Sequence, residues 1–120
     1  MATILIIEDD EKSRRLLCDV LSFHGFAILQ TDRGEEGVEM LASTEVDVVL
    51  MDIQLPGISG FEALARIRAS DCCRKTKVVA VTASVMDTDR RRILEAGFDG
   101  YFPKPVNIRE LVGTVRDMAG

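Results

Sequence analysis

Runs of apolar residues alternate five times with segments whose apolar residues recur at helical spacing, and this alternation constrains the fold most. The apolar runs cover residues 3–7, 27–31, 46–51, 77–81 and 100–102. Runs that are apolar throughout predict strands buried on both faces. When such strands alternate with single helices, the expected result is a parallel sheet with helices on both faces. We therefore predict a three-layer α/β fold, a doubly wound (βα)5 parallel sheet in the flavodoxin-like order 2-1-3-4-5.

Turn and capping residues indicate where the predicted helices begin and end. Gly25 and Gly97 are suited to follow the first and fourth helices, because glycine adopts left-handed backbone angles without strain. Asp87 or Ser84 is expected to start the fourth helix. Capping boxes predict the starts of the second, third and fifth helices at Asp32 with Glu35, Ser59 with Glu62, and Asn107 with Glu110.

Length and composition indicate one domain, expected to span residues 1–120. No apolar run approaches the roughly 20 residues of a membrane span, and no signal-peptide pattern opens the chain. The net charge of −5 argues against nucleic-acid binding, which needs a basic surface. Cys18, Cys72 and Cys73 show no metal-ligand spacing, which indicates free thiols in a reducing cytosol and a cytoplasmic protein.

Polar residues follow four of the predicted strands at the point where each strand ends. Glu8–Asp10 follow the first strand and Asp52 follows the third, while Thr82 and Lys104 follow the fourth and fifth. The carboxyl ends of parallel strands meet at one edge of a sheet, where open α/β folds place their ligands. The switch point between strands 1 and 3 therefore brings Glu8–Asp10 beside Asp52.

The acidic residues at this edge indicate a cation site. Clustered carboxylates repel one another, at about 4 kcal/mol for a pair ~4 Å apart in an effective dielectric near ~20. Oxygen ligands without histidine or cysteine favour Mg²⁺, or Mn²⁺, over zinc. Lys104 and Thr82 add an ammonium and a hydroxyl, so the groups around Asp52 suit a phosphoryl group. The Asp52 carboxylate is then the nucleophile and forms an acyl phosphate.

With these residues in place, the chain resembles the receiver domain of two-component response regulators over its whole length. The resemblance implies that Asp52 is the phosphoacceptor and that Lys104 is the lysine that contacts the phosphoryl group. It also implies that Thr82 is the switch hydroxyl and Tyr101 the switch aromatic residue. Receivers with this motif hold the lysine through a cis bond, so the Lys104–Pro105 peptide is expected to be cis.

The same resemblance implies the metal ligands and the fate of the phosphoryl group. Glu8 and Asp9 form the expected Mg²⁺-binding pair, with Asp9 as the direct ligand, and Asp52 and the backbone carbonyl of Gln54 complete the protein ligands. Gln54 and Ser84 flank the path of a hydrolytic water, and neither accepts a proton strongly. We therefore expect no enzyme activity beyond self-phosphorylation and self-dephosphorylation, the latter taking minutes or longer.

Receiver domains obtain their phosphoryl group from a histidine kinase or a histidine phosphotransfer protein, so these are the expected partners. The resemblance places a downstream protein on the face of the fourth helix, fifth strand and fifth helix, with the chain monomeric or weakly dimeric. Alternatives are a receiver excised from a longer hybrid histidine kinase and a non-phosphorylated interaction module. A dehalogenase-type phosphatase is disfavoured because Gln54 stands where it needs a second aspartate, and Glu8–Asp10 would repel the phosphate of a flavin.

Overall fold

Five parallel strands form a sheet in the order β2-β1-β3-β4-β5, which confirms the predicted α/β architecture. The structure is a computed structural model and describes residues 2–71, 73, 75–83 and 87–119. The strands are β1 (Thr3–Ile7), β2 (Ala27–Thr31), β3 (Val48–Met51), β4 (Lys77–Thr82) and β5 (Gly100–Pro103). Strands β1 and β3 thus lie side by side although a long segment of chain separates them.

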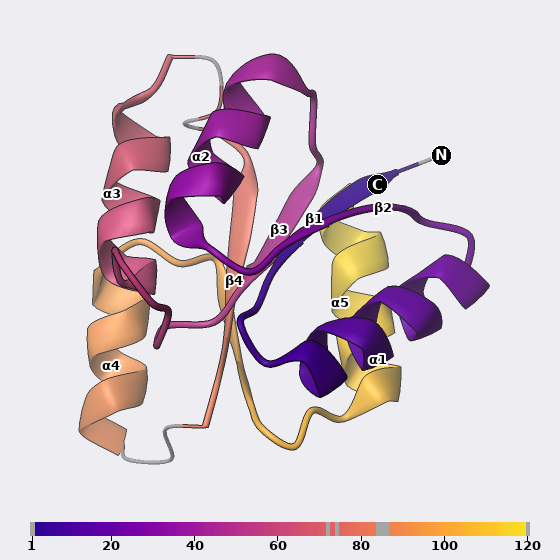
Figure 1. Cartoon of the computed structure of the whole chain (residues 1–120). Helices are drawn as coiled ribbons and strands as arrows, with labels where there is room; N and C mark the ends of the chain where they lie inside the picture. Colours follow the sequence, from indigo (N-terminus) through magenta and orange to yellow (C-terminus); the bar gives the residue numbers. More distant parts are fainter. Residues whose placement is uncertain (1, 72, 74, 84–86, 120) are drawn as a thin grey trace.

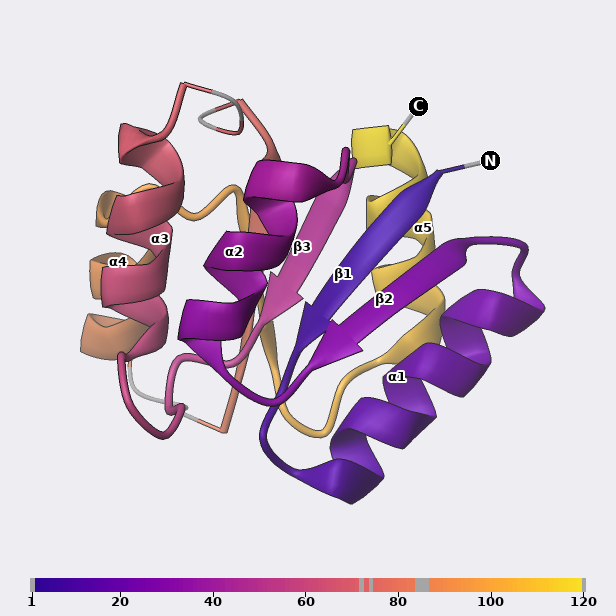
Figure 2. The ribbon, with the colours of Figure 1, turned by 45° about the horizontal axis from the view of Figure 1, so that its top comes forward.

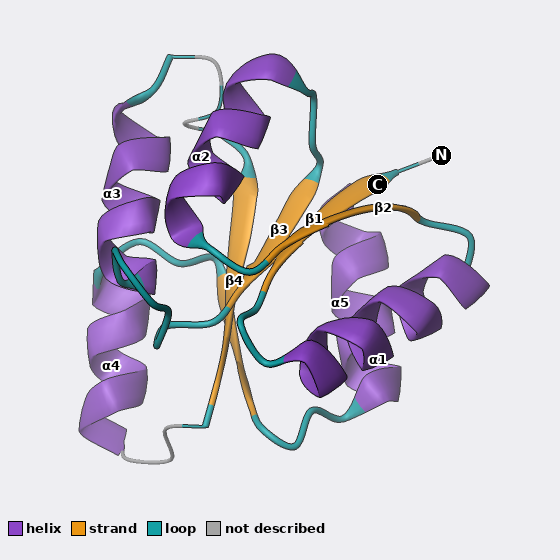
Figure 3. Cartoon of the chain, viewed as in Figure 1, coloured by secondary structure: helices purple, strands orange, loops and turns teal. Residues whose placement is uncertain are grey.

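Helices cover both faces of the sheet and give the molecule three layers (Figures 1 and 3). The helices are α1 (Glu11–Phe23), α2 (Gly34–Ser43), α3 (Gly60–Ala69), α4 (Asp87–Glu95) and α5 (Ile108–Ala119). Helices α2, α3 and α4 lie on one face, and α1 and α5 lie on the other. Within the described part of the chain, none of the helices combines the length and apolarity needed to span a bilayer.

Each face of the sheet has its own apolar core. Successive side chains of a strand point to opposite faces, so Leu5 and Ile7 pack with α2, α3 and α4. Ile4 and Ile6 pack with α1 and α5 on the other side. All four side chains are fully buried. The two cores explain why the first predicted strand is apolar at every position rather than at alternate positions.

The apolar run predicts that the third strand begins at residue 46, but β3 begins at Val48. Val46 is nevertheless buried, so its apolar character reflects packing of the loop before the strand. Asp47 joins this loop to β1, because its N–H donates to the Thr3 carbonyl at 2.9 Å and its carboxylate accepts from the Thr3 N–H at 2.8 Å. Strands β4 and β5 each end one residue later than predicted.

Most of the predicted helix ends are found in the structure. Ser59 accepts a hydrogen bond from the third N–H of α3, that of Glu62, at 3.2 Å. Asn107 accepts one from the Glu110 N–H of α5, also at 3.2 Å. Gly25 follows α1 with a φ of 92°, and α4 begins at Asp87. The alternative start, Ser84, lies outside the described residues.

The capping box predicted at Asp32 and Glu35 is wrong. Helix α2 is preceded by Arg33, which makes no side-chain capping bond, and Asp32 is exposed. The Glu35 carboxylate lies instead against the loop after β3, where it accepts a hydrogen bond from the Ile58 N–H at 3.3 Å. A contact between distant segments has therefore replaced the local capping interaction.

The strand register brings the functional candidates to one edge of the sheet. Ile7, the last residue of β1, pairs with Met51, the last residue of β3. Figure 2 shows β1, β2 and β3 pointing the same way, with both chain termini at the opposite end. The residues that directly follow β1 and β3 are therefore neighbours at the carboxyl edge.

Candidate functional site

Three carboxylates converge where β1 and β3 end. Glu8 and Asp9 follow β1 and Asp52 follows β3, and one carboxylate oxygen from each lies within 4.8 Å of the others. Backbone pairing sets this position, because the Asp52 N–H donates to the Ile7 carbonyl at 3.0 Å. Glu8 and Asp52 are buried and Asp9 is exposed. The cluster therefore reaches solvent on the side of Asp9.

Lys104 brings a positive charge to this cluster from the loop after β5. Its ammonium donates to Glu8 Oε1 and to Asp52 Oδ2, the latter at 2.9 Å. Burial acts to lower the pKa of Lys104, but hydrogen bonds to Glu8 and Asp52 outweigh it and raise the pKa above its usual value. The Lys104–Pro105 peptide bond is cis, as expected from the sequence. Lys104 is thus held as a cation between two acids.

The Glu8 side chain is unusually weak as an acid. Burial raises its pKa from 4.5 to about 7, while the hydrogen bond from Lys104 opposes the shift and the neighbouring Asp52 adds to it. The single ammonium of Lys104 leaves the three carboxylates with an excess of negative charge. The charges around the site therefore favour the binding of a further cation.

The turn between β1 and α1 is fixed by residues that the sequence analysis did not assign to the site. Arg14 donates from Nη1 to the Glu8 carbonyl at 2.9 Å and from Nε to Gln30 Oε1 at 3.2 Å. Asp10 caps α1 by accepting from the Ser13 N–H at 2.9 Å, and hydrogen bonding with the Ser13 side chain, followed by that with its N–H, lowers the pKa of Asp10. An aspartate directly before the first helix was the available signal.

The loop between β3 and α3 orients the central carboxylate. The Gln54 N–H donates to Asp52 Oδ1 at 3.0 Å, and the Gly60 N–H closes the loop on the Ile53 carbonyl at 2.9 Å. A Cβ atom on Gly60 would lie 2.7 Å from the Asp52 carbonyl oxygen, so only glycine allows this approach. The side chain of Gln54 is exposed at the mouth of the site. Asp52 therefore has one oxygen bonded to Lys104 and the other bonded to the loop.

The predicted switch residues lie on the two neighbouring strands. Thr82 ends β4 and is buried, and its carbonyl accepts from the Lys104 N–H at 2.9 Å. Tyr101 of β5 is half-buried and packs against the core on the side of α2, α3 and α4. Ser84, predicted to flank a hydrolytic water, lies outside the described residues. Backbone geometry thus links Thr82 directly to the lysine at the acidic cluster.

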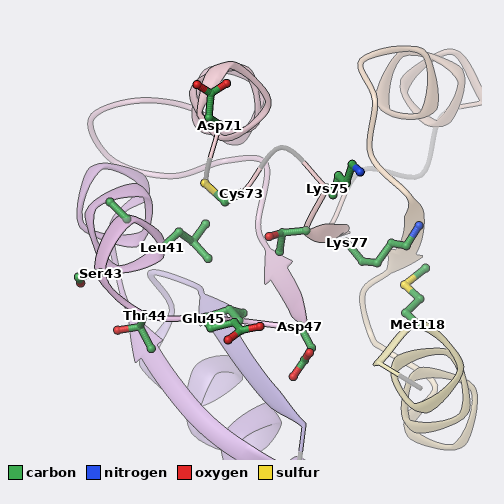
Figure 4. Close-up of a pocket in the computed structure, with 13 residues that line it drawn as sticks. Leu41, Ser43, Thr44, Glu45, Asp47, Asp71, Cys73, Lys75, Lys77 and Met118 are labelled. Carbon is green, nitrogen blue, oxygen red and sulfur yellow. The ribbon is translucent and has the colours of Figure 1, made fainter.

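A hollow of about 770 Å³ lies at the opposite edge of the sheet, far from the acidic cluster (Figure 4). Lys75 and Lys77 line it together with Glu45, Asp47 and Asp71, so its charges have mixed sign. It presents no convergent set of like groups. The groups that converge on one point therefore lie at the carboxyl edge rather than in this hollow.

The acidic cluster fits a divalent metal ion of the hard type. Its donors are carboxylate oxygens, and neither histidine nor cysteine is among them. This is the ligand chemistry that Mg²⁺ and Mn²⁺ prefer in proteins. Close approach of the oxygens, burial of Glu8 and Asp52, and the shortage of positive charge all favour a cation here.

The chain belongs to the response regulator receiver domain family, whose sequence pattern matches residues 4–116. This membership associates the chain with two-component signalling. DivK of Brucella anthropi, a polar-differentiation response regulator, is 32% identical over 118 residues, which cover 98% of this chain and 96% of DivK.

Solved structures of receiver domains share this fold. The receiver domain of the sensor histidine kinase PA1611 from Pseudomonas aeruginosa is 28% identical, with a TM-score of 0.92 over 99% of this chain and 98% of that one. It carries a magnesium ion coordinated in its active-site cleft. The chemotaxis response regulator CheY4 of Vibrio cholerae has the same fold at 22% identity, with a TM-score of 0.90 over 98% of each chain.

Proposed function

We propose that the chain is a phosphorylation switch in which Asp52 accepts a phosphoryl group from a histidine kinase or a histidine phosphotransfer protein. The observation that carries the proposal is the arrangement of the Asp52 carboxylate between two further acids and the Lys104 ammonium. Membership of the receiver family supports it. We place the switch in the cytoplasm, where buried thiols such as Cys18 and Cys73 stay reduced.

Glu8, Asp9, Asp52 and the backbone carbonyl of Gln54 are the groups that would hold Mg²⁺. The three carboxylates fit the ion because they are converging oxygen donors with too little positive charge around them. When bound, Mg²⁺ neutralises negative charge on the phosphoryl group during transfer. The magnesium ion in the cleft of the Pseudomonas aeruginosa domain supports the same role here.

The transfer chemistry can be assigned to particular atoms. An oxygen of Asp52 forms a bond to phosphorus as the bond between phosphorus and the donor's histidine nitrogen breaks. The histidine keeps the electron pair of that bond and takes up a proton from water. The product is an acyl phosphate on Asp52. Lys104, already 2.9 Å from Asp52 Oδ2, stabilises the charge on the phosphoryl oxygens, and the Thr82 hydroxyl is a second donor.

Incubation with acetyl phosphate and Mg²⁺, followed by intact-mass measurement, tests the proposal. We expect one added phosphoryl group on the wild type and none on Asp52→Ala. Chelation of Mg²⁺ should suppress the reaction, because the uncompensated acids repel the donor. A wild type that stays unmodified, or an Asp52→Ala variant that is modified, would contradict the assignment.

The same measurement gives the lifetime of the acyl phosphate after the donor is removed. We expect minutes or longer, because Gln54 and Ser84 offer a water no strong base. Turnover is then limited to the chain's own phosphoryl group, and the protein acts on no other substrate as an enzyme. If the account of the water path is right, Ser84→Glu shortens the lifetime, and a wild-type lifetime of seconds would refute it.

We further propose that phosphorylation changes the face formed by α4, β5 and α5, where a downstream protein binds. Thr82 and Tyr101 form the coupled element, because rotation of the Thr82 side chain toward the phosphoryl group frees space that Tyr101 then fills. A bound charge that favours one of two arrangements is sufficient to shift the population. Beryllofluoride should therefore shift backbone amide resonances in residues 85–102 and in α5, and shifts confined to the site would indicate a passive carrier.

A further inference from the structure

Helix α2 is tied to the loop that carries the phosphoacceptor, although α2 itself contributes no group to the acidic cluster. The Glu35 carboxylate accepts a hydrogen bond from the Ile58 N–H at 3.3 Å. Ile58 belongs to the segment between Asp52 and α3, and its side chain packs against the core. An acid at the start of one helix thus anchors the backbone of this loop at Ile58, 23 residues further along the chain.

The glycines around this contact show that the loop is fitted closely to Glu35. Gly57 has a φ of 75°, and a Cβ atom there would lie 2.5 Å from Glu35 Oε2. A Cβ on Gly34 would lie 3.1 Å from Ile58 Cγ1, so the start of α2 also packs against the loop side chain. The Glu35 carboxylate therefore lies directly against Gly57 and Ile58, and a side chain at position 57 would displace it.

The anchored loop leads directly to the reacting group. From Ile58 the backbone runs back to Gln54, whose N–H donates to Asp52 Oδ1 at 3.0 Å. The far end of the loop is held by the bond from the Gly60 N–H to the Ile53 carbonyl at 2.9 Å. Glu35 supplies a third point of attachment, from outside the loop. Displacement of Gly57 and Ile58 would therefore also change the position of the Gln54 backbone.

We infer that Glu35 is a positioning residue for the phosphoacceptor site, which fixes the loop that carries the Gln54 carbonyl and orients Asp52. This inference rests on the proposed function, since it concerns the metal and phosphoryl chemistry of the same cluster. Removing the Glu35 side chain leaves the partly buried Ile58 N–H without this acceptor and releases the Gly57–Ile58 segment of the loop. The metal ligand on that loop is then less well placed, while the charges of the cluster are unchanged.

Four proteins separate positioning from simple loss of charge: the wild type, Glu35→Ala, Glu35→Gln and the matched control Glu36→Ala. Glu36 is the exposed neighbour of Glu35 on the same helix, so its removal changes the net charge equally. A glutamine at position 35 loses the charge but keeps an oxygen that accepts from the Ile58 N–H. The measurements are Mg²⁺ affinity by calorimetry, the acetyl phosphate reaction rate as a function of Mg²⁺, and thermal stability.

We expect Glu35→Ala to weaken Mg²⁺ binding about 3- to 10-fold, in the range of the net contribution of one ordinary hydrogen bond, because Glu35 acts on the ligand only through the loop. The Mg²⁺ concentration for half-maximal rate should rise by the same factor, with the rate at saturating Mg²⁺ largely retained. Glu35→Gln should recover most of the affinity, and Glu36→Ala should match the wild type. A general loss of stability would not produce this separation between affinity and maximal rate.

Two results would overturn the inference. One is a Glu35→Ala variant with wild-type Mg²⁺ dependence. The other is equal weakening in Glu35→Ala, Glu35→Gln and Glu36→Ala, which would show a long-range charge effect. If the wild type itself neither binds Mg²⁺ nor becomes phosphorylated, the proposed function fails instead, and the two failures are distinguished by that first measurement.

Discussion

An ion pair at one edge of the sheet is balanced in charge, whereas the acidic cluster at the other edge is not. At the edge where the strands begin, Arg68 of α3 pairs with Asp99 at 2.7 Å. Asp99 Oδ2 also accepts from the Val78 N–H at 2.8 Å, and Arg68 donates to the Gly97 carbonyl at 3.3 Å. One acid meets one base in this pair, and both side chains also bond to the backbone.

At the edge where the strands end, acids outnumber bases. Glu8 and Asp52 share the Lys104 ammonium, and Asp9 adds a third carboxylate. The raised pKa of Glu8, caused chiefly by burial, shows how poorly this group is compensated. We interpret the balanced edge as a stabilising contact and the unbalanced edge as a candidate ligand site that lowers stability.

The largest effect on stability is expected at the balanced edge, from Asp99→Ala. The substitution leaves Arg68 and the Val78 N–H without this acceptor, which should destabilise the fold by about 2 kcal/mol. Phosphorylation of the folded protein by acetyl phosphate should be unchanged. Urea unfolding measures the first quantity, with Asp19→Ala, a change at an exposed acid, as control. Loss of phosphorylation in folded Asp99→Ala would break the distinction between the edges.

An intermediate effect is expected from pH at the unbalanced edge. The unfolded chain releases the Glu8 proton near its ordinary pKa of 4.5, whereas the folded protein keeps it until about 7. The folded state therefore binds more protons between these values, and metal-free stability should fall as the pH rises, on the order of 1 kcal/mol. Urea unfolding at about pH 5 and about pH 8 measures the change. A slope of equal size in Glu8→Gln would show that another group is responsible.

The smallest effect is expected from Asp9→Asn. Asp9 is exposed, so removing its charge should raise the metal-free stability only slightly, by up to about 0.5 kcal/mol. The informative quantity is its sign, which is opposite to that of Asp99→Ala because repulsion is relieved. The variant should also lose most of the stabilisation that the wild type gains from added Mg²⁺. Destabilisation without Mg²⁺ would mean that Asp9 makes a favourable contact in the fold.

Sequence patterns were sufficient for the strand order and for the convergence at the carboxyl edge. Both depend on features that act along the chain, namely apolar runs and the polar residue that follows each run. The positions of Asp52, Glu8 and Lys104 follow from parallel pairing alone, since the carboxyl ends of neighbouring strands must meet. Roles such as metal ligation and switching at Thr82 and Tyr101 stay predictions.

Contacts between distant segments could not be predicted from the sequence. Glu35 has the spacing of a capping residue, yet its carboxylate is bonded to Ile58. The Arg92 guanidinium lies 4.5 Å from the centre of the Phe61 ring and so connects α4 with α3, a contact that no sequence pattern indicates. Arg14 of α1 donates to the Glu8 carbonyl, a bond that its place on the helix does not indicate. Each of these side chains is long enough to contact either a local or a distant partner, and the tertiary packing determines which contact forms.

The strand next to Asp52 and the strand that carries Tyr101 differ in how easily they can unpair, because they occupy different places in the sheet. Asp52 follows β3, which has a partner strand on each side, whereas Tyr101 lies on β5, which pairs with β4 alone. Opening β3 would break two ladders of backbone hydrogen bonds at once, and opening β5 breaks one. Pro103, which ends β5, donates no N–H to any ladder. We therefore expect slow amide exchange in the strand that holds Asp52 and faster exchange in the strand that holds Tyr101, which can unpair while the rest of the sheet stays closed.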